Sequence, residues 1–569
     1  MEELYARIKQ LERRRIEYFL DAPDNSHEQY SRDIREGVTD LLQEIPLNIT
    51  ADAKQYLVGK ILNILPDYEP KCEEQLEQSL RANSTRTDAW LELGQCMWKK
   101  RDLIKAHACF KEAVEREPCL PAPKAFCLLS AALRALSDRC ADNGQRVQML
   151  NEALRLCHEA LRLRKSGACK NSTLCPILDI RKPIPFAYYS LANTFLARFF
   201  ALQQNREDDL TLALNAFASA LKMPKMVQNA AVASEDLNED KNDTTEDKQQ
   251  QVPRPFISPD LHLNYGIALY YAQFYAKALA QFRRALAIEP HFGQAKHQLD
   301  SARQFLCALR DGLHKKGNIA KRRLRTLLDT FPLKASTLMA EQHFVMRMKP
   351  ARTLAICSTL DDLIATSSTA NYIGLSLSAV ASAAPAIVAS VTVRCVGVVS
   401  NEEKIPSVII CVDRSSAVVA LSVYNCSAKF GALIGDTFTV IQPNLIRFRW
   451  KDLGLDDDDD DKKKKEYSRS KDGGGAGAAV DKPAVVVVAV DGDDVEAKSA
   501  VAVANKTAEN HQKDDDDDDA EQCLLMIRVI NPSRQLLKNG KPLSSLDCAF
   551  AAMSIETQQM QMGSRARAE

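Results

Sequence analysis

Two stretches of the chain place large and small residues at one shared spacing. The residues of the first stretch are Trp90, Leu93, Gly94, Met97, Ala106, Phe110, Ala113 and Pro118. The residues of the second are Tyr265, Gly266, Leu269, Ala278, Phe282, Ala285 and Pro290. Two antiparallel helices in a unit of about 34 residues need this spacing, because small residues let the helices approach and large residues fill the wedge between them. Each stretch is therefore predicted to form one helical hairpin.

Three weaker hairpins accompany these two. They run over residues 56–76, 126–160 and 188–220, the last two with stretched middles. A hairpin of this kind buries its apolar face only by stacking on a neighbour, and the spacing of the two best units is typical of tetratricopeptide (TPR) repeats. The sequence thus predicts an α-solenoid of TPR repeats, with a capping helix after Pro290.

Beyond about residue 390 the apolar period changes from that of a helix to that of a strand. Short runs rich in β-branched residues cover 391–399, 408–412, 417–424, 437–441, 445–450 and 524–529. Several short strands separated by turn residues suit a small barrel of the OB-fold type. The predicted fold class is α + β multidomain, with the solenoid followed by a small OB-type β-barrel.

Composition shifts give the expected domain boundaries. Residues 230–255 and 452–520 are polar or highly charged and are predicted to be disordered, since like-charge runs cannot pack. The expected parts are N-terminal helices (1–50), TPR repeats (51–229), an acidic loop (230–255), the last repeat with its capping helix (256–330), a linker (331–385), the first part of the OB-fold (386–451), an acidic insert (452–520), the last OB strand (521–545) and a tail (546–569).

Several classes of function find no support in the sequence. It contains no Gly-x-Ser-x-Gly, phosphate-loop or His-Glu-x-x-His motif, so a non-enzymatic protein with no cofactor and no metal is expected. Sixteen cysteines occur without a Cys-x-x-Cys pair, which indicates reduced core residues and a location in the cytoplasm and nucleus. The only long uncharged stretch, residues 372–393, lacks dense large apolar residues, so no membrane partner is expected.

The first helix of each TPR unit is expected to line a groove. Residues of that helix that face away from the second helix are therefore candidate peptide-binding residues. Arg134 and Asp260 are opposite charges expected in the same concavity, suited to a peptide with one acidic and one basic residue. Asn193 is expected between them, where its amide can bond a peptide backbone. In the alternative interpretation, the two charges pair with each other or are simply solvated. Further candidates on this face are Lys99, Tyr270, Gln95, Trp98 and Tyr271.

A basic cluster follows the capping helix. Its residues are His314, Lys315, Lys316, Lys321, Arg322, Arg323 and Arg325. Positive side chains gathered so closely can contact RNA phosphates. In the alternative interpretation, the cluster is an exposed basic helix end that is stabilised by the helix dipole and binds nothing. The middle strands of the barrel, SVIICV and AVVALSVY, carry one aromatic residue, Tyr424, whereas single-strand binding relies on aromatic stacking platforms. A structural or protein-docking role is therefore favoured for the barrel.

The order of these parts resembles a known family. The hairpin segment AWLELGQCMWKKRDLIKAHACF, the segment PDLHLNYGIALYY, and the barrel motifs EEKIP, LIGDTFTV, QPNL and NGKP are similar to those of the tetratricopeptide repeat protein five (Strap) family, which joins a TPR array to a C-terminal OB-fold. The similarity runs from about residue 3 to residue 542, interrupted by the two acidic segments.

The resemblance implies an adaptor in tubulin autoregulation. Such a protein grips the Met-Arg-Glu start of the nascent tubulin peptide at the ribosome, near the exit tunnel, and triggers tubulin mRNA decay through adaptor and deadenylase factors. Arg134 and Asp260 match the family's peptide-contacting residues, whereas Gln294 stands where the family has a groove Glu. The family's ribosome-facing stretch corresponds to residues 316–323. The alternative implied role is a nuclear scaffold of an acetyltransferase coactivator in the stress response.

Overall fold

A computed structural model describes most of the helical part of the chain and the strands of its C-terminal part. The described residues are 2–21, 24–46, 48–116, 123–165, 185–201, 207–221, 258–331, 353–369, 387–399, 406–427, 430–455, 523–544 and 547–548. The predictions for residues 230–255, for most of the insert at 452–520 and for most of the tail therefore lie outside them. Within this part, no helix has the length and apolar character needed to cross a bilayer.

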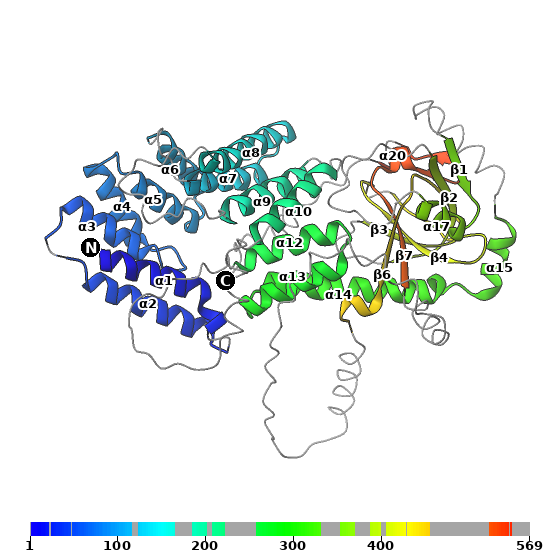
Figure 1. Cartoon of the computed structure of the whole chain (residues 1–569), viewed down its shortest axis with the longest axis horizontal. Helices are drawn as coiled ribbons and strands as arrows, with labels where there is room; N and C mark the ends of the chain where they lie inside the picture. Colours follow the sequence, from blue (N-terminus) through cyan, green and yellow to red (C-terminus); the bar gives the residue numbers. More distant parts are fainter. Residues whose placement is uncertain are drawn as a thin grey trace, which may run out of the picture. The chain divides into compact units, whose positions relative to one another are not determined.

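The helices form hairpins that stack in chain order (Figure 1). The hairpins are α3 (Ala51–Leu62) with α4 (Pro70–Ala82), α5 (Thr87–Lys99) with α6 (Leu103–Glu115), α7 (Pro123–Asp138) with α8 (Asn143–Lys165), α9 (Pro185–Ala201) with α10 (Glu207–Leu221), and α12 (Pro259–Tyr271) with α13 (Tyr275–Ile288). All five occur where the sequence predicts a repeat. The solenoid part of the predicted fold class is confirmed.

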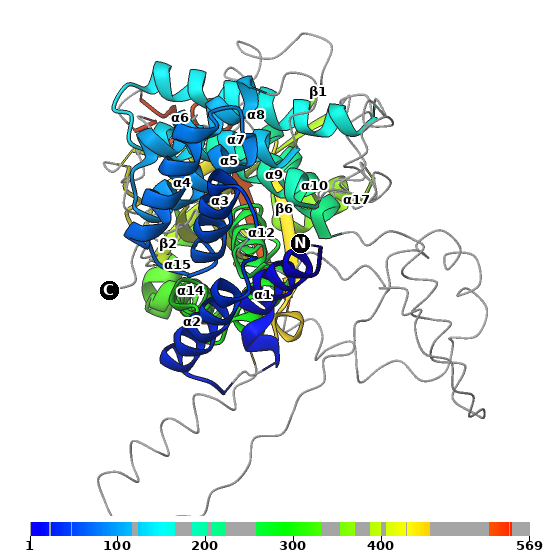
Figure 2. The same cartoon turned by 90° about the vertical axis from the view of Figure 1, so that its left-hand side faces the viewer.

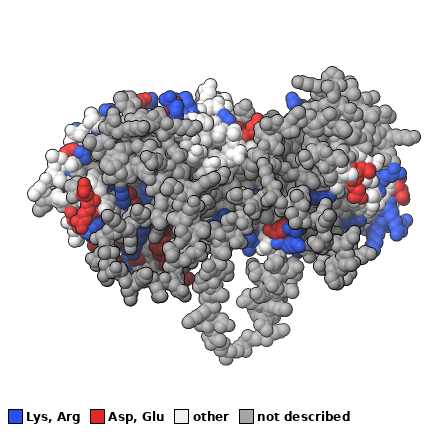
Figure 3. Space-filling model, in the orientation of Figure 1, with Lys and Arg blue, Asp and Glu red and all other residues white. Residues whose placement is uncertain are grey.

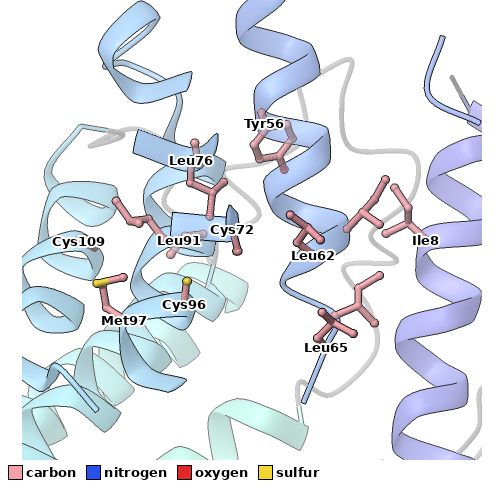
Figure 4. Close-up of a cluster of buried hydrophobic side chains, with 14 of the residues drawn as sticks. Ile8, Tyr56, Leu62, Leu65, Cys72, Leu76, Leu91, Cys96, Met97 and Cys109 are labelled. Carbon is pink, nitrogen blue, oxygen red and sulfur yellow. The ribbon is translucent and has the colours of Figure 1, made fainter. Parts of the chain in front are cut away.

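Small residues of the repeat lie where the two helices of a hairpin come closest. A Cβ added to Gly94 would stand 2.4 Å from the Phe110 ring, and one added to Gly59 would stand 2.5 Å from the Leu76 side chain. Side chains of α1 and of α3 to α6 meet in one buried cluster, which Figure 4 shows. The apolar face of each hairpin is thus covered by its neighbours, as stacking requires.

The array has a helical hairpin before it and a long helix after it. The hairpin is α1 (Glu2–Asp21) with α2 (His27–Gln43), and the long helix is α14 (Gly293–His314). Figures 1 and 2 show α1 beside the last repeat, and α1 contacts α13. The ring of His291 lies 6.0 Å from that of Phe19 and 5.6 Å from that of His27. The N-terminal hairpin therefore packs against the far end of the array.

The strands form one sheet. They are β1 (Thr353–Cys357), β2 (Ile387–Val399), β3 (Ser407–Val412), β4 (Val418–Val423), β5 (Thr437–Ile441), β6 (Asn444–Arg449), β7 (Cys523–Val529), β8 (Leu536–Lys538) and β9 (Lys541–Pro542). The order is β6-β7-β4-β3-β2-β5-β8-β9, with β1 parallel to β2. The other registered pairs are antiparallel. Among the described strands the order is that of an open sheet.

Two short elements appear where the sequence predicts only a linker. Strand β1 and helix α17 (Leu360–Thr369) lie inside the expected linker at 331–385. Asp413 explains part of their placement, because its Oδ2 accepts from the backbone N–H of Leu360 at 2.8 Å. By its contacts the chain forms two compact units: residues 1–445 with 527–569, and residues 446–526, which contain most of the acidic insert.

The capping helix and strands β1 to β5 belong to the first unit, and the helix contacts this part of the sheet directly. Helix α14 packs on β2 and β4. A short 3₁₀ turn, η1 (Lys316–Asn318), then brings the Cα of Gly317 against β2, and a Cβ added to Gly397 would stand 2.8 Å from it. Gly317 has φ of +67°, so both the left-handed backbone and the close approach favour glycine there.

Candidate peptide-binding groove

Three helices that carry predicted groove residues contact one another in order: α7 with α9, and α9 with α12. Arg134 lies on α7, Asn193 on α9 and Asp260 on α12. Asp260 is in the first turn of its helix, where the helix dipole favours a carboxylate. The Ser258 hydroxyl caps the same turn by accepting from the backbone N–H of Leu261 at 3.3 Å.

The hydroxyl of Tyr189 on α9 is influenced by all three of these residues. Burial raises the pKa of its hydroxyl, and the negative charge of Asp260 raises it further. A hydrogen bond from Asn193, the positive charge of Arg134 and a hydrogen bond from Asn264 all lower that pKa. The charges of Arg134 and Asp260 and the hydrogen bonds from Asn193 and Asn264 therefore all influence the same hydroxyl.

Amides form the centre of the site. The Asn264 Nδ2 donates to Asn193 Oδ1 at 3.1 Å and to the Tyr189 hydroxyl at 3.4 Å. Asn193 is 5% exposed and Asn264 is 3% exposed. This pair joins α9 to α12, so Asn193 is held by a neighbouring helix.

The Arg134 guanidinium is held by α9. Its Nη1 donates to the Thr194 hydroxyl at 3.1 Å and lies 3.5 Å from the carbonyl oxygen of Ser190. Thr194 is fully buried and donates in turn to the Ser190 carbonyl at 2.7 Å. One end of the guanidinium is therefore fixed by hydrogen bonds, which orients an otherwise long and mobile side chain.

Three further predicted groove residues, Tyr270, Tyr271 and Gln294, lie on α12 and α14. Tyr270 is half-buried, and its ring packs against those of Tyr275 and Phe305 at 5.4 and 6.1 Å. Tyr271 is buried against Phe200. Gln294 lies in the first turn of α14, partly buried. The two tyrosines contribute mainly to packing between helices.

The prediction that Lys99 binds peptide requires a correction, because its ammonium is bonded to groups of the array itself. It donates to the Asn63 carbonyl, to Asn63 Oδ1 at 3.0 Å and to the Leu65 carbonyl at 2.7 Å. These three bonds use all three donors of the ammonium and satisfy carbonyls just beyond the end of α3. Burial, together with the charge of Arg15, lowers the pKa of Lys99 to about 8.

Lys99→Met is expected to lower the free energy of unfolding by about 2 kcal/mol, because buried carbonyls lose their donors. Peptide affinity should stay unchanged. Since folded Lys99 releases its proton more readily than the unfolded residue, the stability difference between wild type and variant should grow between pH 8 and 10. Urea unfolding at several pH values measures both effects. A tenfold loss of peptide affinity without a loss of stability would instead show that Lys99 binds the peptide.

The predicted basic cluster is divided by the structure. Lys315 forms an ion pair with Asp311 at 2.8 Å. Lys316 donates to the carbonyl and the hydroxyl of Ser416, both at 2.9 Å, in the turn between β3 and β4. Lys316 thus helps to hold the sheet on the array, and the prediction that it contacts RNA is corrected accordingly.

Helix α15 (Lys321–Asp329) carries four exposed residues of the cluster: Lys321, Arg322, Arg323 and Arg325. Figure 3 shows Lys and Arg gathered at the edge where Figure 1 places α15. Three of these charges occupy the first turn, where the helix dipole disfavours cations. The dipole alternative therefore fails for α15. Arg394 of β2 fixes the other end of the helix, donating to the Leu327 carbonyl and, at 3.1 Å, to the Thr330 carbonyl.

Some residues of the site could not be predicted from the sequence. Tyr189, Thr194 and Asn264 were not predicted, although all three lie on first helices of predicted repeats. Their role depends on contacts between helices of different repeats, which helical spacing alone does not reveal. Helix α14 also packs on β2 and β4, and a Cβ added to its Gly312 would stand 3.1 Å from Ile410 of β3.

Comparison with known proteins supports the architecture. Residues 384–458 match the family model described as the tetratricopeptide repeat protein 5 OB fold domain. The chain is 25% identical to tetratricopeptide repeat protein 5 of Homo sapiens over 402 residues, which cover 70% of this chain and 75% of that protein. It is 26% identical to the Bos taurus protein of the same name over 431 residues, 75% and 82% of the two chains. The resemblance and the OB-type part of the predicted fold are confirmed.

A solved structure, a thermophilic TPR protein of Thermus thermophilus, is 17% identical and covers 44% of this chain and 98% of its own, with a TM-score of 0.30. That score is too low to inform the fold.

Proposed function

We propose that this chain, a relative of tetratricopeptide repeat protein 5, is a peptide-binding adaptor that recognises the N-terminus of nascent tubulin at the ribosome and triggers tubulin mRNA decay. The general assignment, an adaptor with TPR and OB parts, follows from the relatives and the fold. The specific peptide, the ribosome and the decay pathway are the proposal.

One observation supports the peptide assignment above all others. Arg134 and Asp260 lie on α7 and α12, which both contact α9, and both charges influence the pKa of the Tyr189 hydroxyl on α9. A peptide with neighbouring basic and acidic side chains can place its carboxylate at Arg134 and its guanidinium at Asp260. The Met-Arg-Glu start of tubulin has this chemistry.

The exposed first turn of α15 supports the ribosome assignment. A polyanion would relieve the repulsion between the helix dipole and the charges of Lys321, Arg322 and Arg323. These three residues, and not Lys316, are the proposed contacts with ribosomal RNA or a ribosomal protein. Gln294 cannot supply the negative charge that the family has at its position, so Asp260 is the principal partner of the peptide arginine.

Co-sedimentation with stalled ribosomes tests the proposal. Ribosomes carrying a tubulin nascent chain should retain the wild-type protein more strongly than ribosomes carrying a chain that begins Met-Ala-Ala. Arg134→Ala should reduce the tubulin-specific retention about 30-fold or more, as expected for truncating one partner of a charged contact. Replacing Lys321, Arg322 and Arg323 by Glu should remove retention on both kinds of ribosome.

Arg139→Ala is the matched control for Arg134→Ala, because Arg139 is exposed directly after α7. It should retain the wild-type preference. Equal retention on the two kinds of ribosome would contradict the tubulin assignment. No retention of the wild type on either kind would instead favour the nuclear scaffold role.

A further inference from the structure

Asn264 has one polar atom that the fold leaves unused. Its side chain is 3% exposed, and its Nδ2 donates to Asn193 and Tyr189. Its Oδ1 is closed to solvent, and no donor within the described residues reaches it. Buried polar atoms almost always have a partner, because an unsatisfied one is destabilising. Such an acceptor in a candidate groove calls for a donor from outside the chain.

The position of this acceptor narrows the choice of donor. Asn264 bonds to the hydroxyl of Tyr189 on α9, and α9 contacts both the helix of Arg134 and the helix of Asp260. Two side chains of a bound peptide would be engaged by the charges of Arg134 and Asp260, so the peptide main chain between them would pass near Asn264. A main-chain amide carries one N–H donor, which matches the single unused acceptor.

We propose that Asn264 Oδ1 accepts a hydrogen bond from the main-chain N–H that joins the basic and acidic residues of the bound peptide. The inference rests on the proposed peptide-binding function. It states which main-chain N–H of the bound peptide lies at Asn264, and so fixes the register of the peptide. The bond from Asn264 to the Tyr189 hydroxyl is 3.4 Å long, against 3.1 Å for its bond to Asn193, so the bond to Tyr189 is the weaker of the two and the easier to displace when the peptide enters. Asn193 then remains as the partner that holds the Asn264 amide in place.

A scan with ester-containing peptides tests the inference on the unmodified full-length protein. A peptide beginning Met-Arg-Glu is compared with versions in which one amide at a time becomes an ester, which removes a single N–H. The ester between Arg and Glu should weaken binding about tenfold, the usual effect of losing one hydrogen bond to a buried group. Esters further along the peptide should change affinity less than about twofold.

A variant provides the second measurement. Asn264→Ala should bind the amide and the ester peptide equally, because the acceptor is gone, whereas Asn215→Ala, an exposed control on α10, should keep the tenfold difference. Circular dichroism melts establish that each variant is folded. If Asn264→Ala does not fold, the ester scan on the wild type still decides.

The outcomes separate this inference from the function on which it rests. Tight binding of the Met-Arg-Glu peptide with no ester sensitivity between Arg and Glu would overturn the role of Asn264 and leave the function standing. Sensitivity at a different amide would overturn the proposed register. Failure of the parent peptide to bind, or binding unaffected by Arg134→Ala, would overturn the function itself.

Discussion

Asp209→Ala is expected to lower the free energy of unfolding by about 3–5 kcal/mol, the cost of leaving one charge of a buried ion pair without its partner. Arg198 of α9 donates to both carboxylate oxygens of Asp209 on α10, at 2.9 Å from Nε and 2.5 Å from Nη2. The Asp209 side chain is 1% exposed and that of Arg198 is 14% exposed. Arg198 also bonds to Asn151 at 3.0 Å, so the pair links two repeats.

Asp208→Ala is the matched control, since Asp208 precedes Asp209 in the first turn of α10 and is exposed. Both variants lose a carboxylate from the same helix turn, so the difference between them reports the buried pair alone. Urea unfolding should show a change below about 0.5 kcal/mol for Asp208→Ala. If both variants lose the same stability, the ion pair of Arg198 and Asp209 contributes nothing specific.

The sequence could not predict this pair. Asp209 falls at the end of the stretch that lengthens the unit, where the repeat spacing offers no guide to neighbours. An ion pair between two helices depends on the angle and register at which they pack, and these are set by all the side chains of the interface. The same limit applies to Lys99, whose helix position was correct but whose ammonium bonds just beyond the end of α3.

The basic cluster shows a second limit. Its charges are evident in the sequence, but only the structure separates Lys316, which bonds to Ser416, from the exposed first turn of α15. The break between α14 and α15 depends on three consecutive residues with positive φ, Lys316, Gly317 and Asn318. In a sequence, glycine is the residue that indicates a backbone with positive φ. Because Lys316 and Asn318 are not glycine, the sequence did not predict a break between the two helices at this point.

Other parts of the site follow directly from local rules. The spacing of Arg134 and Asp260 within their repeats predicted the helix face on which each lies, because side chains three and four residues apart share a face. The structure adds what spacing cannot provide, which is that both charges influence the pKa of Tyr189 in the intervening unit. The hairpins were predictable for the same reason: the small residues of a repeat have to lie opposite its large ones.

Gly266→Val is therefore expected to destabilise the protein strongly, by about 3 kcal/mol. A Cβ on Gly266 would stand 2.5 Å from Cε1 and 2.7 Å from Cδ1 of Phe282, well inside van der Waals contact. Phe282 is fully buried between α12 and its neighbours, so its ring has no free space into which to move. Either α12 separates from α13 or the ring leaves its rotamer, and both changes cost packing energy.

Gly293→Val is the control, because a Cβ there would have no neighbour within 4 Å. It should alter the free energy of unfolding by less than about 0.5 kcal/mol, as usual for an exposed site. Thermal melts and urea unfolding of the two variants measure the difference. A loss at Gly293 as large as that at Gly266 would mean that backbone freedom, and not contact with Phe282, is what requires glycine. A loss confined to Gly266 would instead show that the approach of the two helices sets the residue size at this position of the repeat.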